Sequence, residues 1–87
     1  MSSSETEAPC DHELDAKGLA CPMPLLKAKM ALNKMSAGQV LRVFTTDPGS
    51  VRDFHAFANL SHHDLLNFIE HDDFYEYLFL CQEKKPT

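Results

Sequence analysis

The segment Cys21-Pro22-Met23-Pro24 combines a thiol with two prolines at the start of a predicted helix. Backbone N–H groups and the macrodipole at a helix start favour negative charge. A cysteine thiolate carries such a charge, and thiols at helix N-termini have lowered pKa values and act as nucleophiles. The sequence therefore predicts one reactive sulfur, that of Cys21, on a rigid support. The alternative is that Cys21 packs as a small buried hydrophobe.

The two prolines limit which amides can reach this sulfur. If Cys21 is the N-cap, its side chain would accept a hydrogen bond from the second or third helical residue. Pro22 and Pro24 have no N–H, which leaves only the amide of Met23. We therefore expect a rigidly placed thiol whose pKa is lowered only modestly. Three nearby lysines would add to this lowering if they approached the thiol: Lys17, Lys27 and Lys29.

The elements around Cys21 follow from the spacing of apolar residues. Residues 13–17 alternate in the manner of a short strand, and Gly18 turns the chain toward Cys21. Pro22 suits the first position of a helix, and Gly38 is typical of the residue that ends one. The apolar stripe of this helix, which we expect to face the core, consists of Leu25, Ala28, Leu32 and Met35.

The rest of the chain predicts another helix and three more strands. The expected segments are a strand at 39–46, a helix from Pro48 to about 59, a strand at 65–70, a turn at 71–73 and a strand at 74–82. The order β-α-β-α-β-β predicts an α+β fold, a two-layer α/β sandwich with a mixed four-stranded sheet and two helices on one face. We expect a single domain at 12–83, between a disordered tail at 1–11 and a frayed end at 84–87.

Composition narrows the class of function. The 87-residue chain carries a formal net charge of −5, which argues against direct binding of nucleic acid. No apolar run reaches the roughly 20 residues of a membrane span, and the polar N-terminus lacks the pattern of a signal peptide. The sequence therefore predicts a cytoplasmic protein without membrane contact. Lysines crowd the region of Cys21, and this local patch favours an acidic protein partner.

The cysteines and histidines indicate neither a disulfide framework nor a metal site. Three cysteines without a secretion signal favour free thiols. Cys81 is expected in the last strand as core packing, whereas Cys10 is either a bystander or a thiol able to reach Cys21. No pair of the five histidines has the spacing of a structural zinc site, and the His62 and His63 side chains should diverge. We expect no metal and no cofactor.

Two motifs resemble those of the TusA-like, or SirA-like, sulfur-carrier family. The first is Gly18-Leu19-x-Cys21-Pro22-x-Pro24, at the join of the first strand and helix. The second is Thr46-Asp47-Pro48-x-x-x-Arg52-Asp53, at the start of the second helix. The resemblance covers residues 13–82 and includes the order of the elements. One difference is Met23, because many members carry an acidic residue between the two prolines.

The resemblance implies a function for Cys21. It implies that this cysteine accepts sulfane sulfur as a persulfide from a cysteine desulfurase and passes it to a downstream relay protein. Destinations in the family include the 2-thio group of tRNA wobble uridine, the molybdenum cofactor and oxidative sulfur metabolism. The resemblance also gives Asp47, Pro48, Arg52 and Asp53 a structural or partner role. From the residues alone, Asp47 would cap the second helix, and Arg52 and Asp53 would be solvated.

A second surface is predicted beside the thiol. Met23, Leu26 and Met30 lie on one side of the first helix, away from its core stripe, and flexible Met side chains suit adaptable binding surfaces. We interpret these three residues, with Lys17 and Lys27 nearby, as a docking surface for the sulfur donor and acceptor. The alternative is that they pack against the second helix. Nothing in the sequence requires more than a monomer.

The sequence is also compatible with two other functions. One is a regulatory or interaction module that uses this fold without sulfur chemistry. The other is a thiol redox enzyme that pairs Cys10 with Cys21. A rhodanese domain is not expected, because the chain is too short for one and lacks its cysteine-to-arginine active-site loop.

Overall fold

The computed structural model describes residues 10–82, so the expectations for residues 1–9 and for the frayed end at 84–87 lie outside the described part. The six elements follow the predicted order: β1 (His12–Ala16), α1 (Met23–Lys34), β2 (Val40–Thr45), α2 (Gly49–Leu60), β3 (Asp64–Glu70) and β4 (Tyr75–Leu80). Within residues 10–82, no helix has the length and apolar character that crossing a membrane requires.

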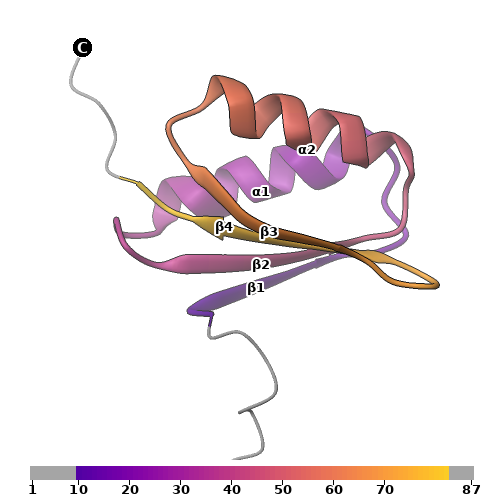
Figure 1. Cartoon of the computed structure of the whole chain (residues 1–87), viewed down its shortest axis with the longest axis horizontal. Coiled ribbons are helices and arrows are strands. Elements are labelled where there is room, and N and C mark those ends of the chain that lie inside the picture. The colour runs from indigo at the N-terminus through magenta and orange to yellow at the C-terminus, as the bar shows by residue number, and fades with distance from the viewer. Residues whose placement is uncertain (1–9, 83–87) are drawn as a thin grey trace, which may run out of the picture.

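The four strands form one mixed sheet in the order β1-β2-β4-β3. β1 runs parallel to β2, whereas β4 is antiparallel to both β2 and β3. Both helices cover the same face of this sheet (Figure 1). The predicted two-layer architecture is therefore confirmed, and it brings the β1–α1 and β2–α2 connections to the same end of the sheet.

The core lies between the helices and the covered face of the sheet. Leu41 and Val43 of β2 point into it, as the alternation of a half-buried strand requires. Phe54 of α2 stacks on Tyr77 of β4 with ring centroids 4.3 Å apart, and Phe79 lies next to this pair. The apolar faces of both helices thus pack on one continuous cluster.

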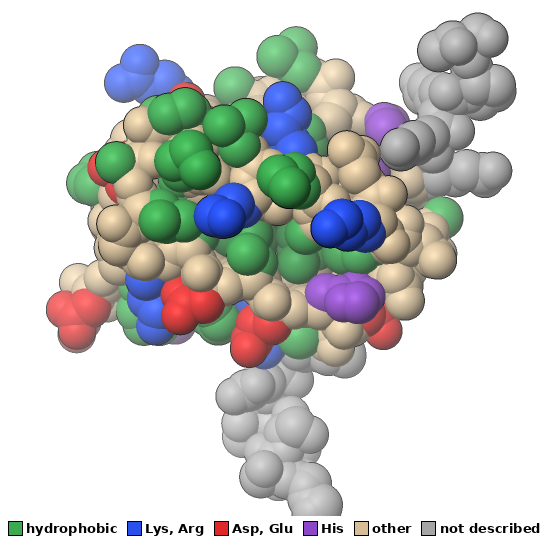
Figure 2. All heavy atoms as spheres, turned by 180° about the vertical axis from the view of Figure 1, so that it is seen from behind, with side chains coloured by type: hydrophobic (Ala, Val, Ile, Leu, Met, Phe, Trp, Pro, Cys, Tyr) green, Lys and Arg blue, Asp and Glu red, His purple; other side chains and the backbone are tan. Residues whose placement is uncertain are grey.

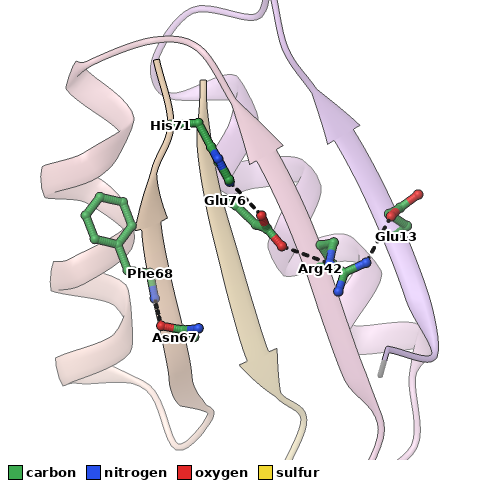
Figure 3. Close-up of polar contacts among 6 residues, drawn as sticks. All are labelled: Glu13, Arg42, Asn67, Phe68, His71 and Glu76. Atoms are coloured by element: carbon green, nitrogen blue, oxygen red, sulfur yellow. Dashed lines mark hydrogen bonds and ion pairs between the residues drawn. The ribbon is translucent and has the colours of Figure 1, made fainter. Parts of the chain in front are cut away.

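The uncovered face of the sheet carries an ionic network. Arg42 of β2 is only 5% exposed, and its side chain lies between Glu13 of β1 and Glu76 of β4 (Figure 3). Arg42 Nε is 3.0 Å from Glu76 Oε2, and Nη1 is 3.5 Å from Glu13 Oε2. His71 Nε2 lies 2.8 Å from the other oxygen of Glu76. These contacts join three strands through side chains.

Two expected element ends differ in the structure. α1 ends at Lys34, with an extended Met35 as its C-cap, so the prediction that Gly38 ends this helix was wrong. Gly38 has a φ of +92° and donates its N–H to Cys81 O, which makes it the turn that starts β2. Cys81 is buried as expected but lies just after β4.

The histidine pair between α2 and β3 was also misjudged. His62 and His63 do not diverge, because their ring centroids lie 4.2 Å apart. The bend after α2 replaces the extended backbone on which the divergence was argued. His63 is buried, and its Nδ1 accepts the backbone N–H of Gln82 at 3.0 Å. This pair therefore ties the end of α2 to the chain that follows β4.

Candidate functional site

Cys21 is exposed in the loop between β1 and α1. The loop begins at Gly18, whose φ of +84° is one that only glycine adopts readily. The N–H of Gly18 donates to Thr46 Oγ1 at 2.9 Å, which fastens the loop to the end of β2. The alternative of a buried Cys21 is thus ruled out, and the thiol stands on a loop held at its base.

Asp47 holds the backbone of this loop. Its Oδ2 accepts the N–H of Cys21 at 3.0 Å. The expectation that Asp47 caps α2 through its side chain was therefore wrong. The N-cap of α2 is Pro48, and no side-chain capping bond forms there. Instead the backbone carbonyl of Asp47 accepts from both the N–H and the hydroxyl of Ser50.

Asp53 contacts the sulfur itself. The Sγ–H of Cys21 donates to Asp53 Oδ2 across 2.5 Å. The two residues are far apart in sequence and meet because α1 and α2 start at the same end of the sheet (Figure 1). The prediction that Asp53 is merely solvated was wrong, whereas the neighbouring Arg52 is exposed.

These carboxylates shift the pKa of the Cys21 thiol in the direction opposite to the one predicted from the sequence. The pKa of Cys21 is raised above its ordinary value, first by the hydrogen bond to Asp53 and further by desolvation and by the negative charges of Asp53 and Asp47. The positive charge of Arg52 opposes this rise. A hydrogen bond that the thiol donates favours the protonated form. The modest lowering expected from the helix start is therefore contradicted.

The geometry explains why the helix start does not lower the pKa. α1 has Pro22 as its N-cap, and the N–H of Met23 donates to Ala20 O at 2.9 Å. The Met23 N–H, the one donor expected at the sulfur, is therefore engaged by the Ala20 carbonyl instead.

Two of the three lysines expected near the thiol lie against aromatic rings. Lys17 Nζ is 4.9 Å from the centroid of Phe74, and Lys29 Nζ is 5.8 Å from that of Phe57.

Gly49 belongs to the site and was missed by sequence reasoning. It is the first residue of α2 and lies directly beside the thiol-bearing residue. A Cβ at this position would come within 3.1 Å of Asp47 Oδ2 and 3.5 Å of Cys21 Cβ. A side chain here would therefore press on the Asp47 carboxylate that holds the loop. The glycine after Pro48 was the available signal for this close approach.

The predicted strip on α1 is exposed. We call Met23, Leu26 and Met30 the α1 strip; their exposed fractions are 42%, 44% and 58%. Figure 2 shows hydrophobic side chains and lysine or arginine side chains interspersed over α1. Packing against α2 is therefore not what these residues do. Pro24, in contrast, is buried under the first turn.

Two shallow grooves flank α1. One, of about 400 Å³, lies between α1 and α2 and includes Lys29, Phe57, Leu60 and the carboxylate-bearing Asp53. The other, of about 410 Å³, lies between α1 and β1 and includes Lys27 and Met30. Leu60 is 87% exposed at the end of α2, and sequence reasoning did not single it out. The available signal was an apolar residue just after the predicted end of the second helix at about 59.

The remaining candidates stand apart from this site. Cys10 is half-buried and Cys81 is buried. Among residues 10–82, no three His, Cys, Asp or Glu side chains come together in a way that could hold a metal ion. The reactive groups gathered at this site are the Cys21 thiol and the carboxylates of Asp47 and Asp53 beside it.

The fold and the site define a small two-layer domain that presents one exposed thiol, that of Cys21, at the meeting point of two helix starts. The family model described as "Sulfurtransferase TusA" matches residues 12–80. The chain belongs to the TusA sulfurtransferase family.

Several relatives support this assignment. The sulfur carrier protein TusA of Allochromatium vinosum is 53% identical over 68 residues, which cover 78% of this chain and 90% of the relative. A putative sulfur carrier protein of Bacillus subtilis is 46% identical over 63 residues, 72% of this chain and 84% of the relative. The crystal structure of a SirA-like protein from Desulfitobacterium hafniense has a TM-score of 0.73 and 27% identity, covering 84% of this chain and 100% of that one.

Proposed function

We propose that this protein is a sulfur carrier that holds sulfane sulfur as a persulfide on Cys21 and passes it to another protein. The observation that carries the proposal is the exposed Cys21 thiol on a loop fastened by Asp47 and Thr46. A carrier has to expose its sulfur to two different proteins in turn, and a fixed, accessible thiol meets that need. The relative from Allochromatium is described as a sulfur carrier protein and the one from Bacillus as a putative sulfur carrier protein.

The chemistry needs no group beyond thiols. A donor persulfide, R–S–SH, reacts with Cys21–SH to give R–SH and Cys21–S–SH. The Cys21 sulfur forms a bond with the outer sulfur of the donor persulfide, and the S–S bond of the donor breaks. The inner sulfur of the donor, which is bound to R, leaves with the electron pair and takes up a proton. Passing the sulfur to an acceptor thiol repeats the same exchange. Each step is a thiolate attack of the kind seen in thiol–disulfide exchange.

The proposed partners are a cysteine desulfurase as donor and a cysteine-bearing relay protein as acceptor. The α1 strip, with Lys17 and Lys27 nearby, would dock them, and the groove that contains Asp53 would extend this surface. Flexible methionines allow one surface to fit two different partners. Tyr and Trp are absent from the strip, which suits transient rather than permanent contact.

We further propose that the sulfur serves 2-thiolation of tRNA wobble uridine or related sulfur trafficking in the cytoplasm. A net charge of −5 favours handing the sulfur to a protein over binding the tRNA directly. An odd number of cysteines, three in all, suits a reducing compartment better than a disulfide framework. The protein would act as a monomer between its partners.

Intact-mass spectrometry tests the carrier proposal. After incubation with a cysteine desulfurase and cysteine, the protein should gain the mass of one sulfur atom, and a reducing thiol should remove it. Cys21→Ser should gain nothing, whereas Cys10→Ser should still be loaded. A wild-type protein that gains no sulfur would instead favour an interaction module. An intramolecular disulfide that is lost in Cys10→Ser would favour a redox enzyme.

Met30→Asp tests the docking surface. Met30 is 58% exposed, so a charge here should leave the unfolding temperature unchanged but weaken loading by the desulfurase. Asn67→Asp is the matched control, because it adds the same charge on the exposed part of β3. If Met30→Asp loads as fast as Asn67→Asp, the α1 strip is not the docking surface.

A further inference from the structure

The Cys21 thiol is exposed, yet it does not point freely into solvent. It donates a hydrogen bond to Asp53 Oδ2 across 2.5 Å. Hydrogen bonds to a charged acceptor are about twice as strong as those between neutral groups. A chain that only needed an accessible thiol would not need this carboxylate. The contact therefore calls for a role connected with the sulfur.

The charged groups near the thiol come from α2, from the β2–α2 connection and from α1. α2 contributes Asp53 and Arg52, and the β2–α2 connection contributes Asp47, all three of which act on the ionisation of Cys21. α1 contributes Lys29, which shares a groove with Asp53 but has its Nζ over the ring of Phe57. Two carboxylates thus face the thiol and one guanidinium opposes them.

We propose that Asp53 is a positioning residue that distinguishes the empty carrier from the loaded one. It holds the empty Cys21 as a neutral thiol, and it repels the anionic persulfide that forms when sulfur is added. This proposal rests on the proposed carrier function. It assigns to Asp53 a task that neither the sulfur exchange nor the fold by itself requires.

The physical basis is the change in acidity on loading. A thiol has a proton to donate at neutral pH, and a nearby carboxylate stabilises that protonated form. A persulfide is more acidic than a thiol, so it has lost its proton at neutral pH. Two negative groups at hydrogen-bond distance repel each other. The carboxylate that retains the empty sulfur therefore drives the loaded sulfur outward, where an acceptor protein can reach it.

The empty carrier also becomes slow to react with unrelated electrophiles, because only the thiolate is nucleophilic. Loading then requires that the donor protein neutralise or displace the Asp53 carboxylate when it docks. A positively charged group on the donor would do so. Docking and activation of the thiol would be coupled in this way, which restricts sulfur transfer to the correct complex.

The alkylation rate of the unloaded protein as a function of pH tests this directly. Iodoacetamide modification at Cys21 is followed by peptide mass spectrometry, which separates it from the other thiols. Asp53→Asn should move the midpoint of the profile to lower pH and raise the rate at pH 7 several-fold, because the carboxylate that favours the protonated thiol is gone. Asp72→Asn, an equal charge change on the exposed β3–β4 turn, should leave the profile unchanged.

Two further variants keep the test decisive if Asp53→Asn fails to fold. Arg52→Gln should move the midpoint to higher pH, because this guanidinium opposes the carboxylates. Asp47→Asn should lower the midpoint by less than Asp53→Asn does. An Asp53→Asn profile that coincides with that of Asp72→Asn would overturn the proposal. So would an Arg52→Gln midpoint that falls.

The loaded protein supplies the second measurement. At pH 7 the persulfide is anionic in wild type and in Asp53→Asn, but without the repelling carboxylate it is no longer driven outward, so its alkylation rate in Asp53→Asn should not exceed that of wild type. Because the unloaded thiol reacts faster in Asp53→Asn, the ratio of loaded to unloaded rates should fall several-fold. An unchanged ratio would contradict the role of Asp53. If no loaded protein forms at all, the carrier function fails, while the unloaded profile still tests the carboxylate.

Discussion

Two thiols of this protein, those of Cys21 and Cys81, donate hydrogen bonds to oxygen and yet differ in everything that governs reactivity. Cys21 is exposed and donates to the Asp53 carboxylate at 2.5 Å. Cys81 is 2% exposed and donates to the Leu32 carbonyl at 3.5 Å, between the end of β4 and the end of α1. Burial decides which sulfur another protein can reach, and the hydrogen-bond partner decides how readily the reachable one ionises.

The largest expected difference between these thiols is their rate of alkylation in the folded protein. Cys81 becomes accessible only when the core opens, whereas Cys21 needs no opening. We expect iodoacetamide to modify Cys81 at least about a hundredfold more slowly than Cys21 at pH 8. Peptide mass spectrometry over time measures both rates in one sample. Comparable rates would mean that the end of β4 opens readily.

For the free energy of unfolding, we expect the larger effect at Cys81 and the smaller one at Cys21. Cys81→Ala removes a buried side chain from the core cluster and should lower the free energy of unfolding by about 1–2 kcal/mol. Cys21→Ala removes an exposed side chain and should change it by less than about 0.5 kcal/mol. Urea unfolding monitored by circular dichroism gives both values. A larger loss for Cys21→Ala would show that the loop supports the fold as well as the thiol.

Gly49→Ala should affect the site more than the fold. The added Cβ meets Asp47 Oδ2 at 3.1 Å, so this carboxylate has to shift away from the Cys21 backbone N–H. We expect loading with sulfur to slow several-fold, while the unfolding free energy changes by less than about 1 kcal/mol. Asn59→Ala, an alanine substitution at an exposed position of the same helix, is the control. Normal loading of Gly49→Ala would show that Asp47 is not needed to hold the loop.

The smallest effect is a pH dependence of stability that Cys21 confers. Its pKa in the folded protein is above the ordinary value of 9.0, so the folded state holds the proton more tightly than the unfolded chain does. The resulting stabilisation is complete below pH 9 and is lost as the pH rises through the folded pKa. Thermal unfolding between pH 7 and pH 10.5 should show this loss in wild type but not in Cys21→Ser. If the stability of wild type and of Cys21→Ser falls equally with rising pH, Cys21 contributes nothing to the pH dependence.

The sequence was sufficient for the features that local pattern controls. The apolar stripe of α1 predicted which of its residues face the core, because the helix period places them on one face. The proline and glycine positions around Cys21 predicted an exposed thiol on a turn. The α1 strip followed from its angular position away from Ala28 and Leu32.

The errors arose where residues distant in sequence meet. Asp47 and Asp53 were interpreted within their own helix, as a cap and as a solvated charge. Their actual partners are the N–H and the thiol of Cys21, which only the shared end of β1 and β2 brings near. The sign of the pKa shift was wrong for the same reason. The residues near Cys21 in sequence indicate the start of α1, but they give no sign of the Asp53 carboxylate that α2 places beside the thiol.

The most direct test of the sulfur-carrier role is to locate the added sulfur in wild-type protein that retains all three cysteines. The protein is loaded by a cysteine desulfurase with cysteine, trapped with iodoacetamide and analysed by peptide mass spectrometry. We expect the persulfide adduct on the peptide that contains Cys21 and none on those of Cys10 and Cys81. An adduct on either of the other two cysteines, or on no peptide at all, would contradict this assignment.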